Sequence, residues 1–224
     1  MLSGAGISAE SGLRTFRDSD GLWEEHRVED VATPEAWSRD MDLVLRFYNQ
    51  RRTQLANAFP NEAHRILAEL ESEWDVQIIT QNVDDLHERA GSSKVLHLHG
   101  ELTKVRSSVN RNEILDIGYR ELQKGEFCTE GSQLRPHIVW FGEDVPLIEQ
   151  AAILTAEADV LIVVGTSLNV YPAAGLINYA SSDCRHYLVD PDPSMKSYED
   201  HGITVVNEKA TSGMSLVAQY LKEI

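Results

Sequence analysis

The 224-residue sequence predicts an α/β protein, with a Rossmann-like parallel sheet, helices on both faces of the sheet and a smaller inserted lobe. Short β-branched runs alternate with helical patterns along the chain, which is typical of parallel strands joined by helices. Residues 160–164 are apolar at every position, as expected of a strand that is covered on both faces. Two stretches, 26–62 and 101–135, interrupt this alternation and predict the lobe.

The elements of the core follow from these patterns in order. Strands are expected at residues 76–80, 95–99, 160–164, 186–189 and 203–206, and helices at 63–74, 148–158 and 212–224. The chain therefore predicts one domain, with a core of about 1–25, 63–100 and 136–224. Only three residues precede the first glycine turn, so either the first strand is unusually short or the natural start lies upstream.

The composition excludes several classes of protein. With 20 Lys and Arg against 36 Asp and Glu, the formal charge is −16 and the pI is about 4.8, which disfavours nucleic-acid binding. The longest apolar run has five residues, whereas a membrane-spanning helix needs about 20, and no secretory signal is visible. The two cysteines, Cys128 and Cys184, lie far apart, so we expect a reduced, cytoplasmic protein without a disulfide framework.

Glycines and hydroxyls follow two of the expected strands. Gly4, Ala5 and Gly6 open a turn of the kind that brings backbone N–H groups close to a pyrophosphate, although a plain turn into a helix is equally compatible. Gly165, Thr166 and Ser167 follow the buried strand and suit a ribose or a phosphate. Both segments belong at the carboxyl edge of the sheet, where open α/β sheets bind ligands.

Polar residues with possible catalytic roles follow two other strands. Asn82 and Asp84, next to Gln81, could hold a primary carboxamide, although Asn-x-Asp is also ordinary helix-capping chemistry. His97 and His99 alternate with leucines and so share one face of a strand. A histidine there could take a proton from a sugar hydroxyl, although a strand histidine is usually a hydrogen-bonded structural residue.

Tyr48 and Arg51 are three residues apart on an expected helix, so they project from one face. A phenol beside a guanidinium forms a receptor for a carboxylate. A solvated helix face is the alternative, since Arg46 and Arg52 are close in sequence.

Five motifs in order resemble those of the sirtuins, NAD-dependent protein-lysine deacylases. They are residues 4–18, the Gln-Asn-x-Asp of 81–84, the Leu-His-Gly of 98–100, the Val-Trp-Phe-Gly-Glu of 139–143 and the Gly-Thr-Ser of 165–167. The resemblance covers nearly the whole chain. It implies attack of the acyl oxygen on the nicotinamide-bearing ribose, release of nicotinamide, and formation of free lysine and an acylated ADP-ribose.

The resemblance also implies roles for individual residues. His99 matches the catalytic base, Asn82 takes part in catalysis and His97 is structural. The NAD-binding residues are Gly4, Ala5, Gly6, Ile7, Glu10, Thr15, Phe16, Arg17, Trp23, Gln81, Asn82, Val83, Asp84, Gly165, Thr166, Ser167, Asp190, Pro191, Asp192 and Ala210. Asp190 precedes a proline, so an Asp-Pro turn is an alternative to a ribose contact.

The substrate side resembles that of sirtuins that remove acidic acyl groups. Tyr48 and Arg51 match the pair that recognises the acyl carboxylate, and Ala32 matches the small residue that leaves room for a longer acyl chain. An acylated protein substrate is expected to add as a strand along Val139, Trp140, Phe141, Gly142 and Glu143. Succinyl- or malonyl-lysine is therefore the expected substrate, with acetyl-lysine a weaker one.

The sequence departs from the family at the zinc site and in one loop. Most sirtuins use four cysteines between the catalytic histidine and the Trp-Phe-Gly segment, but only Cys128 lies in that interval here, so no metal is expected. Arg14 stands where the family usually has proline. A catalytically silent NAD- or ADP-ribose-binding module and a mono-ADP-ribosyltransferase remain alternatives. An ordinary dehydrogenase is disfavoured, because no Tyr-x-x-x-Lys proton relay is found.

Overall fold

The computed structural model describes residues 1–14, 22–23 and 26–223, and it contains the predicted parallel sheet. Six parallel strands run in the order β11-β10-β9-β1-β4-β5. Their bounds are Leu2–Ser3 for β1, Ile78–Thr80 for β4, Val95–His97 for β5, Val160–Val164 for β9, Arg185–Val189 for β10 and Thr204–Val206 for β11. Counted along the chain, this is the doubly wound order 6-5-4-1-2-3, which confirms the Rossmann-like class.

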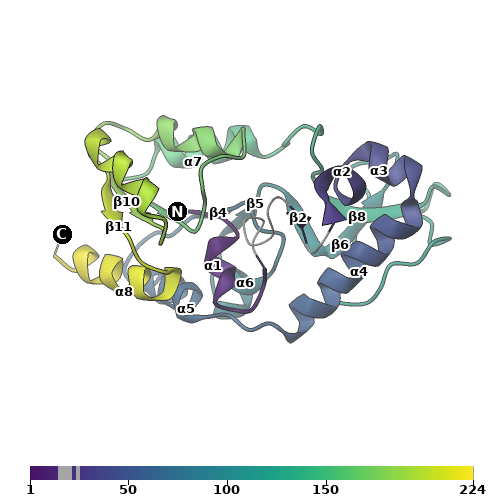
Figure 1. Cartoon of the computed structure of the whole chain (residues 1–224), viewed down its shortest axis with the longest axis horizontal. Helices are drawn as coiled ribbons and strands as arrows, with labels where there is room; N and C mark the ends of the chain where they lie inside the picture. The colour runs from purple at the N-terminus through teal and green to yellow at the C-terminus, as the bar shows by residue number, and fades with distance from the viewer. Residues whose placement is uncertain (15–21, 24–25, 224) are drawn as a thin grey trace.

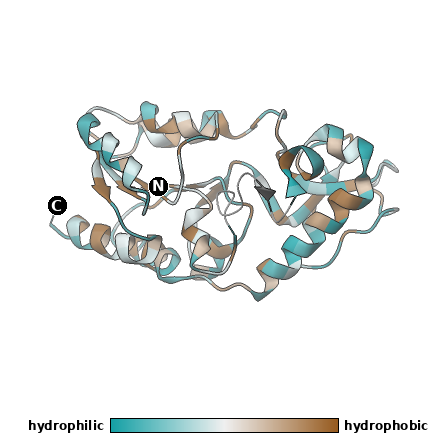
Figure 2. Ribbon diagram, viewed as in Figure 1, coloured by the Kyte–Doolittle hydropathy of each residue, from teal (hydrophilic) through white to brown (hydrophobic). Residues whose placement is uncertain are grey.

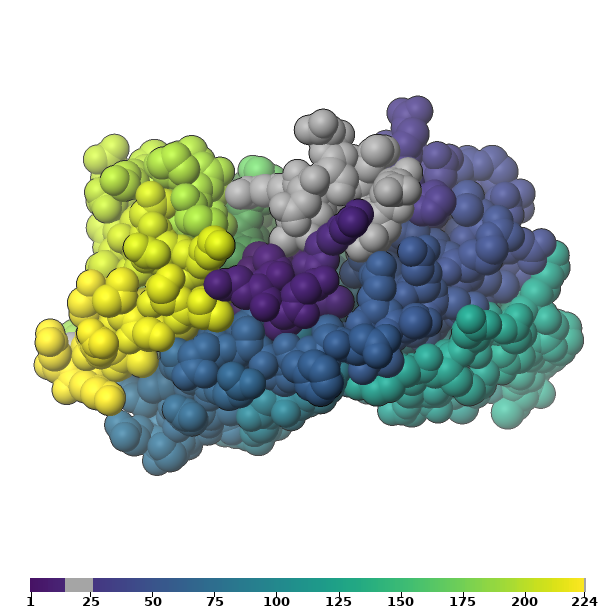
Figure 3. Space-filling view, turned by 60° about the horizontal axis from the view of Figure 1, so that its bottom comes forward, coloured from purple at the N-terminus to yellow at the C-terminus, as the bar shows by residue number. Residues whose placement is uncertain are grey.

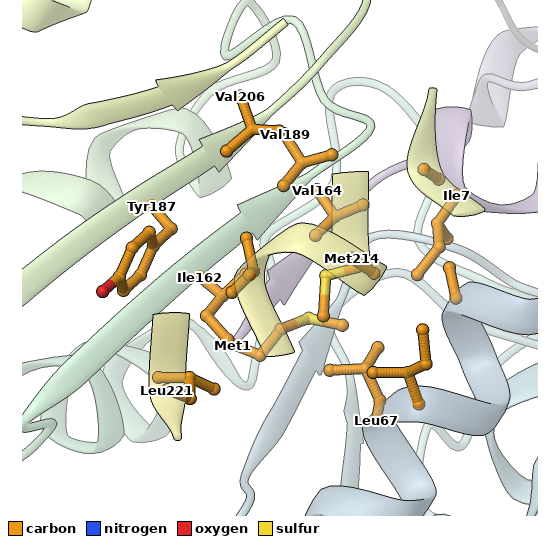
Figure 4. Packing of buried hydrophobic residues seen from close by; sticks show 14 of the residues in the cluster. Met1, Ile7, Leu67, Ile162, Val164, Tyr187, Val189, Val206, Met214 and Leu221 are labelled. Atoms are coloured by element: carbon orange, nitrogen blue, oxygen red, sulfur yellow. The ribbon is translucent and has the colours of Figure 1, made fainter. Parts of the chain in front are cut away.

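Helices cover both faces of this sheet (Figure 1). One face packs on α1 (Gly6–Ala9), α5 (Glu62–Leu70) and α8 (Ala210–Leu221), around a core that Figure 4 shows from Met1 to Leu221. The other face packs on α7 (Ile148–Ala156) and the 3₁₀ helices η1 (Ala173–Tyr179) and η2 (Pro193–His201). Figure 2 shows hydrophobic and hydrophilic residues side by side on α7 and α8, as expected of helices that bury one stripe.

A second lobe lies at the other end of the molecule (Figure 1). It contains the antiparallel sheet β7-β6-β8, formed by Ile114–Asp116, Gly100–Ser107 and Leu134–Ile138. The helices α2 (Val28–Val31), α3 (Pro34–Arg39) and α4 (Met41–Asn57) complete it, with a short pairing of β2 (Leu22–Trp23) and β3 (His26–Arg27). The sequence predicts a lobe from residues 26–62 and 101–135 but not the three strands of its sheet.

Buried polar contacts join α4 to the sheet of this lobe. Arg52 is fully buried, and its Nε donates to the Leu102 carbonyl of β6 (2.7 Å) while Nη1 donates to the Asn49 side chain (2.9 Å). The amide of Asn49 also binds both the N–H and the carbonyl of Leu122. Because each of these groups is removed from water, the lobe depends on all of the bonds being made together.

The remaining short helix, α6 (Leu86–Ala90), follows β4 and ends at Gly91 in the left-handed conformation. It carries Glu88, and the residues just before it include Asn82 and Asp84. Among the described residues, no helix is long and apolar enough to cross a membrane.

Candidate functional site

The glycine turns after β1 and β9 meet where the strand order reverses. The Gly6 N–H donates to the Gly165 carbonyl (2.8 Å), and Gly4 donates to the end of β9 (3.0 Å). A Cβ on Gly6 would lie 2.7 Å from Gly165 Cα, and one on Gly165 would lie 2.3 Å from the backbone nitrogen of Ile7. Gly165 also has a φ of +62°, so only glycine fits there. The two predicted turns therefore form one bare backbone surface, at the position where this fold binds dinucleotides.

Asn82 and Asp84 come together through Ser8 of α1. The Asn82 amide donates to Ser8 Oγ (3.2 Å), which in turn donates to Asp84 Oδ2 (3.0 Å). Asp84 Oδ1 accepts from the N–H of Leu86, the first residue of α6, whose N-cap is Asp85. Burial raises the pKa of Asp84, while the Leu86 and Ser8 hydrogen bonds oppose that shift. These contacts hold the amide and carboxyl groups beside Ser8 of α1.

His99 lies in the turn after β5 and is held by the loop that follows β4. Its Nδ1 lies 3.1 Å from the Gln81 carbonyl, which assigns the proton to Nδ1 and leaves Nε2 as an acceptor. Burial lowers the pKa of His99, and the hydrogen bond to Gln81 opposes the shift. Gln81 itself donates to the hydroxyl of Thr166 (3.2 Å). His99, the loop of Gln81 and Asn82 and the Gly-Thr-Ser turn are thus joined at one edge of the sheet.

His97 has a contact that the sequence did not reveal. Its Nε2 lies 2.7 Å from Glu88 Oε1, and its Nδ1 lies 3.2 Å from the carbonyl of Asn82. Burial alone would lower the pKa of His97, but the hydrogen bond and charge of Glu88 outweigh it and raise the pKa. Both ring nitrogens of His97 thus face acceptors, and the ring joins the backbone of Asn82 to Glu88 of α6. The alternation of leucines and histidines predicts that both histidines share a strand face, but β5 ends at His97 and His99 lies in the turn that follows.

The segment Val139 to Glu143 joins the two lobes. Val139 donates its N–H to the His99 carbonyl (2.9 Å), and Phe141 donates to the Ala32 carbonyl (3.0 Å). Gly142 has a φ of +87°, which turns the chain back toward the lobe. Glu143 then accepts from Arg106 (3.1 Å), from Arg135 through two nitrogens and from the Trp140 N–H. The Phe141 ring is exposed, so this end of the segment faces solvent.

Tyr48 and Arg51 lie on α4, beside the same segment. Tyr48 is fully buried and accepts a hydrogen bond from the Trp140 indole (2.9 Å). Burial raises the pKa of Tyr48, against the opposing charge of Arg51 nearby. Arg51 is partly exposed and lies over the Phe47 ring, 5.9 Å from Cζ to the ring centroid. Ala32, Tyr48 and Trp140 share one buried cluster.

Other residues predicted to bind NAD make turn and helix contacts. Asp190 is buried, and its Oδ1 accepts from the Asp192 N–H (2.9 Å), which is the contact of an Asp-Pro turn through Pro191. Glu10 accepts from the N–H and hydroxyl of Thr211. Ala210 is buried at the start of α8. Figure 3 shows the purple N-terminal residues beside the yellow C-terminal segment. Their cofactor roles stay predictions.

The other residues predicted to bind NAD differ in their surroundings. Ile7 is fully buried under the sheet, Val83 is buried beside Ala32, and Ser167 is partly exposed. Trp23 belongs to β2. Thr15, Phe16 and Arg17 lie outside the described residues.

The small lobe contains a cysteine and a hollow that lie outside the set of predicted cofactor residues. Within the described part of the chain, no group of three or more His, Cys, Asp or Glu side chains could hold a metal ion. Cys128 instead lies 2.9 Å from the Ser132 hydroxyl, in a turn of the small lobe. A hollow of about 380 Å³ lies between α4 and residues 121–124, lined by Asn49 and Lys124 among others. None of the residues that line this hollow belongs to either glycine turn.

The fold and the glycine surface define a dinucleotide-binding α/β protein. Residues 4–172 match the Sir2 family, so the chain belongs to the Sir2 family, the sirtuins. It is 52% identical to an NAD-dependent protein deacylase of Helicobacter pylori, covering 96% of this chain and 93% of the relative. It is 50% identical to an NAD-dependent protein deacylase of Bacteroides thetaiotaomicron, covering 99% and 96%.

Solved structures agree with this assignment. A complex of a Sir2 homologue with NAD has a TM-score of 0.87 and 39% identity, covering 99% of this chain and 88% of the other. A mutant Sir2 homologue bound to ADP-ribose has a TM-score of 0.88 and 39% identity, covering 99% and 90%.

Proposed function

We propose that this enzyme is an NAD-dependent protein-lysine deacylase that prefers succinyl- or malonyl-lysine and accepts acetyl-lysine less efficiently. Membership of the Sir2 family and about 50% identity to NAD-dependent protein deacylases support the deacylase activity. The acyl preference rests on this chain's own residues around Tyr48 and Arg51.

The residues at the sheet edge fit NAD. Gly4, Gly6 and Gly165 form a backbone surface that no Cβ could share, which suits the close approach of a pyrophosphate. The buried amide of Asn82 and carboxyl of Asp84 offer a donor and an acceptor for the nicotinamide carboxamide. When bound, NAD supplies the ADP-ribosyl group that receives the acyl group as nicotinamide leaves.

His99 is proposed as the general base. The Gln81 carbonyl accepts a hydrogen bond from Nδ1–H, so Nε2 is the nitrogen that can take a proton from a ribose hydroxyl. Burial lowers its pKa, which keeps the imidazole neutral near pH 7. His97 and Glu88 support the same loop through the Asn82 carbonyl, one residue further on.

One observation carries the acyl preference: residues 139–141 connect the base to the proposed acyl pocket. Successive groups in this segment donate to the His99 carbonyl (2.9 Å), the Tyr48 phenol oxygen (2.9 Å) and the Ala32 carbonyl (3.0 Å). An acyl chain that starts beside His99 and passes Ala32 thus extends toward Tyr48 and Arg51. The phenol and guanidinium suit the terminal carboxylate of that chain. Since Tyr48 is fully buried, entry of the acyl chain must displace what covers it.

The test is mass spectrometry of acetyl-, malonyl- and succinyl-lysine peptides of one sequence, incubated with and without NAD. We expect NAD-dependent removal of all three groups, fastest for the dicarboxylic ones. A silent binding module would release neither lysine nor nicotinamide, and an ADP-ribosyltransferase would add mass to the protein or peptide.

Arg51→Met isolates the electrostatic part of the preference, because it keeps the side-chain stem and removes the charge. A hydrogen bond to a charged group contributes about 1.5–3 kcal/mol, so the ratio of kcat/KM for succinyl-lysine over acetyl-lysine should fall about 10- to 150-fold. The matched control is Arg46→Met on the same helix, which should leave this ratio unchanged. Equal losses on both substrates in the Arg51 variant would contradict the acidic-acyl assignment.

A further inference from the structure

Trp140 lies in the segment predicted to bind the substrate backbone, yet its side chain points into the protein. The residue is 2% exposed, and its indole Nε1 donates to the Tyr48 hydroxyl at 2.9 Å. The two rings are tilted, with centroids 6.5 Å apart, so the hydrogen bond joins their polar ends. Trp140 therefore contacts the proposed acyl receptor directly, from the interior of the protein.

The direction of this hydrogen bond is fixed by chemistry. An indole N–H can only donate, so the phenol oxygen of Tyr48 is the acceptor, and its own proton is directed away from Trp140. Burial keeps the phenol protonated by raising its pKa. A carboxylate can only accept. Tyr48 can therefore donate its hydroxyl proton to a carboxylate. The guanidinium of Arg51, on the same helix face, is the second donor.

Arg135 and Glu143 hold Trp140 by its ring and by its backbone. Arg135 stacks on the Trp140 ring, with Cζ 3.3 Å from the ring centroid. Glu143 accepts from the Trp140 backbone N–H (2.9 Å) and binds both Arg135 and Arg106. All three charged side chains are less than 10% exposed, so this clamp is shielded from salt and solvent. The position of the indole is therefore set before any substrate enters.

We propose that Trp140 is a positioning residue for acyl specificity, which orients the Tyr48 hydroxyl toward the carboxylate of a dicarboxylic acyl group. This inference rests on the proposed preference for succinyl- or malonyl-lysine. It gives Trp140 a task distinct from backbone pairing with the peptide. It also connects the Arg106–Glu143–Arg135 clamp to substrate choice.

A double-mutant cycle tests the inference with Trp140→Phe, Tyr48→Phe and the double variant. Phenylalanine keeps an aromatic ring beside Arg135, and it removes the indole N–H together with the volume of the second ring of the indole. The measured quantity is the ratio of kcat/KM for succinyl-lysine over acetyl-lysine in one peptide. We expect Trp140→Phe to lower the ratio about 3- to 10-fold in the native background. In the Tyr48→Phe background it should lower the ratio no further, because the hydroxyl on which it acts is gone.

Trp37→Phe is the matched control. Its ring packs on Trp140 with centroids 5.8 Å apart, so the same exchange is made in the same cluster. We expect an unchanged ratio for this variant. The inference is overturned if Trp140→Phe leaves the ratio unchanged, or lowers it equally in both Tyr48 backgrounds. Absence of any dicarboxylic preference in the unsubstituted enzyme would overturn the proposed function instead, and this inference with it.

Discussion

His99 is the residue whose environment makes the clearest prediction for catalysis. A base must be neutral to accept a proton, and burial lowers the pKa of His99 below the ordinary value of about 6.5. Activity should therefore be retained as the pH falls to that value and be lost only below it. The pH dependence of kcat/KM on the acidic side measures this loss of activity. His99→Ala should abolish deacylation while NAD binding, followed by calorimetry, persists. Near-native turnover in that variant would remove His99 from the mechanism.

The pair of His97 and Glu88 predicts a pH dependence of stability. The raised pKa of His97 means that its contribution is fully present below about pH 6.5 and is lost as the pH rises through the folded-state pKa. The lowered pKa of Glu88 means that its contribution is present above about pH 4.3 and is lost at lower pH. The pair thus stabilises the fold between these two limits.

His97→Gln removes this titration and keeps a side chain that can donate to the Asn82 carbonyl. We expect it to cost about 1–2 kcal/mol at pH 6, less than a fully buried pair because Glu88 is partly exposed. Urea unfolding at pH 6 and pH 8.5 should show a smaller stability difference between these pH values in the variant than in the native chain. An identical difference in both proteins would show that the pair is energetically silent.

Single residues were predictable where their type and strand-end position define their chemistry. Asn82 follows the end of β4 and His99 follows the end of β5, and both lie at the carboxyl edge of the sheet. His97 was assigned a structural role, but its partner Glu88 lies on the helix that follows β4 and becomes visible only in the folded chain. The contact between Trp140 and Tyr48 spans 92 residues, and no local pattern indicates it.

At the scale of elements, the start of α5 supports the glycine turn. Asn61 caps this helix by accepting from Ala63 (3.0 Å), and its amide donates to the Ile7 carbonyl (2.7 Å) and to Ser11 (3.0 Å). Asn61→Ala should therefore cost about 2 kcal/mol of stability and raise the KM for NAD, since the turn after β1 loses its support. Urea unfolding and NAD titration of the rate measure the two effects.

The start of α4 provides the comparison for this variant. Asp40 caps that helix by accepting from Leu43 (2.9 Å), away from the glycine turn. Asp40→Ala should cost about 1 kcal/mol without changing the KM for NAD. If both cap variants change that KM alike, the effect comes from general loss of stability and not from the turn.

Elements with strong local patterns were predicted well. Residues 160–164 form β9 with the predicted bounds, because a run of apolar residues identifies a doubly covered strand. Predicted helix 63–74 corresponds to Glu62–Leu70, and predicted helix 212–224 corresponds to Ala210–Leu221. The strands of the small lobe were missed, because β6 buries Arg106 and Ser107 against partners distant in sequence. Such polar burial does not produce an alternating pattern.

For the whole molecule, the small lobe should be stable without a metal. Only one cysteine lies between Gly100 and Trp140, whereas a structural zinc site needs four nitrogen or sulfur ligands. Buried bonds from Asn49 and Arg52 join α4 to the rest of the lobe instead. Elemental analysis should find no stoichiometric zinc, and a chelator should leave Tm and turnover unchanged. One zinc ion per purified chain would contradict this.

The proposed pairing of a substrate peptide with the segment that joins the lobes has a consequence for what the peptide must provide. The N–H groups of Val139, Trp140, Phe141 and Glu143 all bind acceptors within the chain. A peptide that pairs with these four residues as proposed therefore meets their carbonyl oxygens and must supply the donors itself. Every amino acid except proline carries such a donor. The enzyme would then tolerate nearly any side chain beside the modified lysine and exclude proline at the paired positions, which is a selection by backbone chemistry alone.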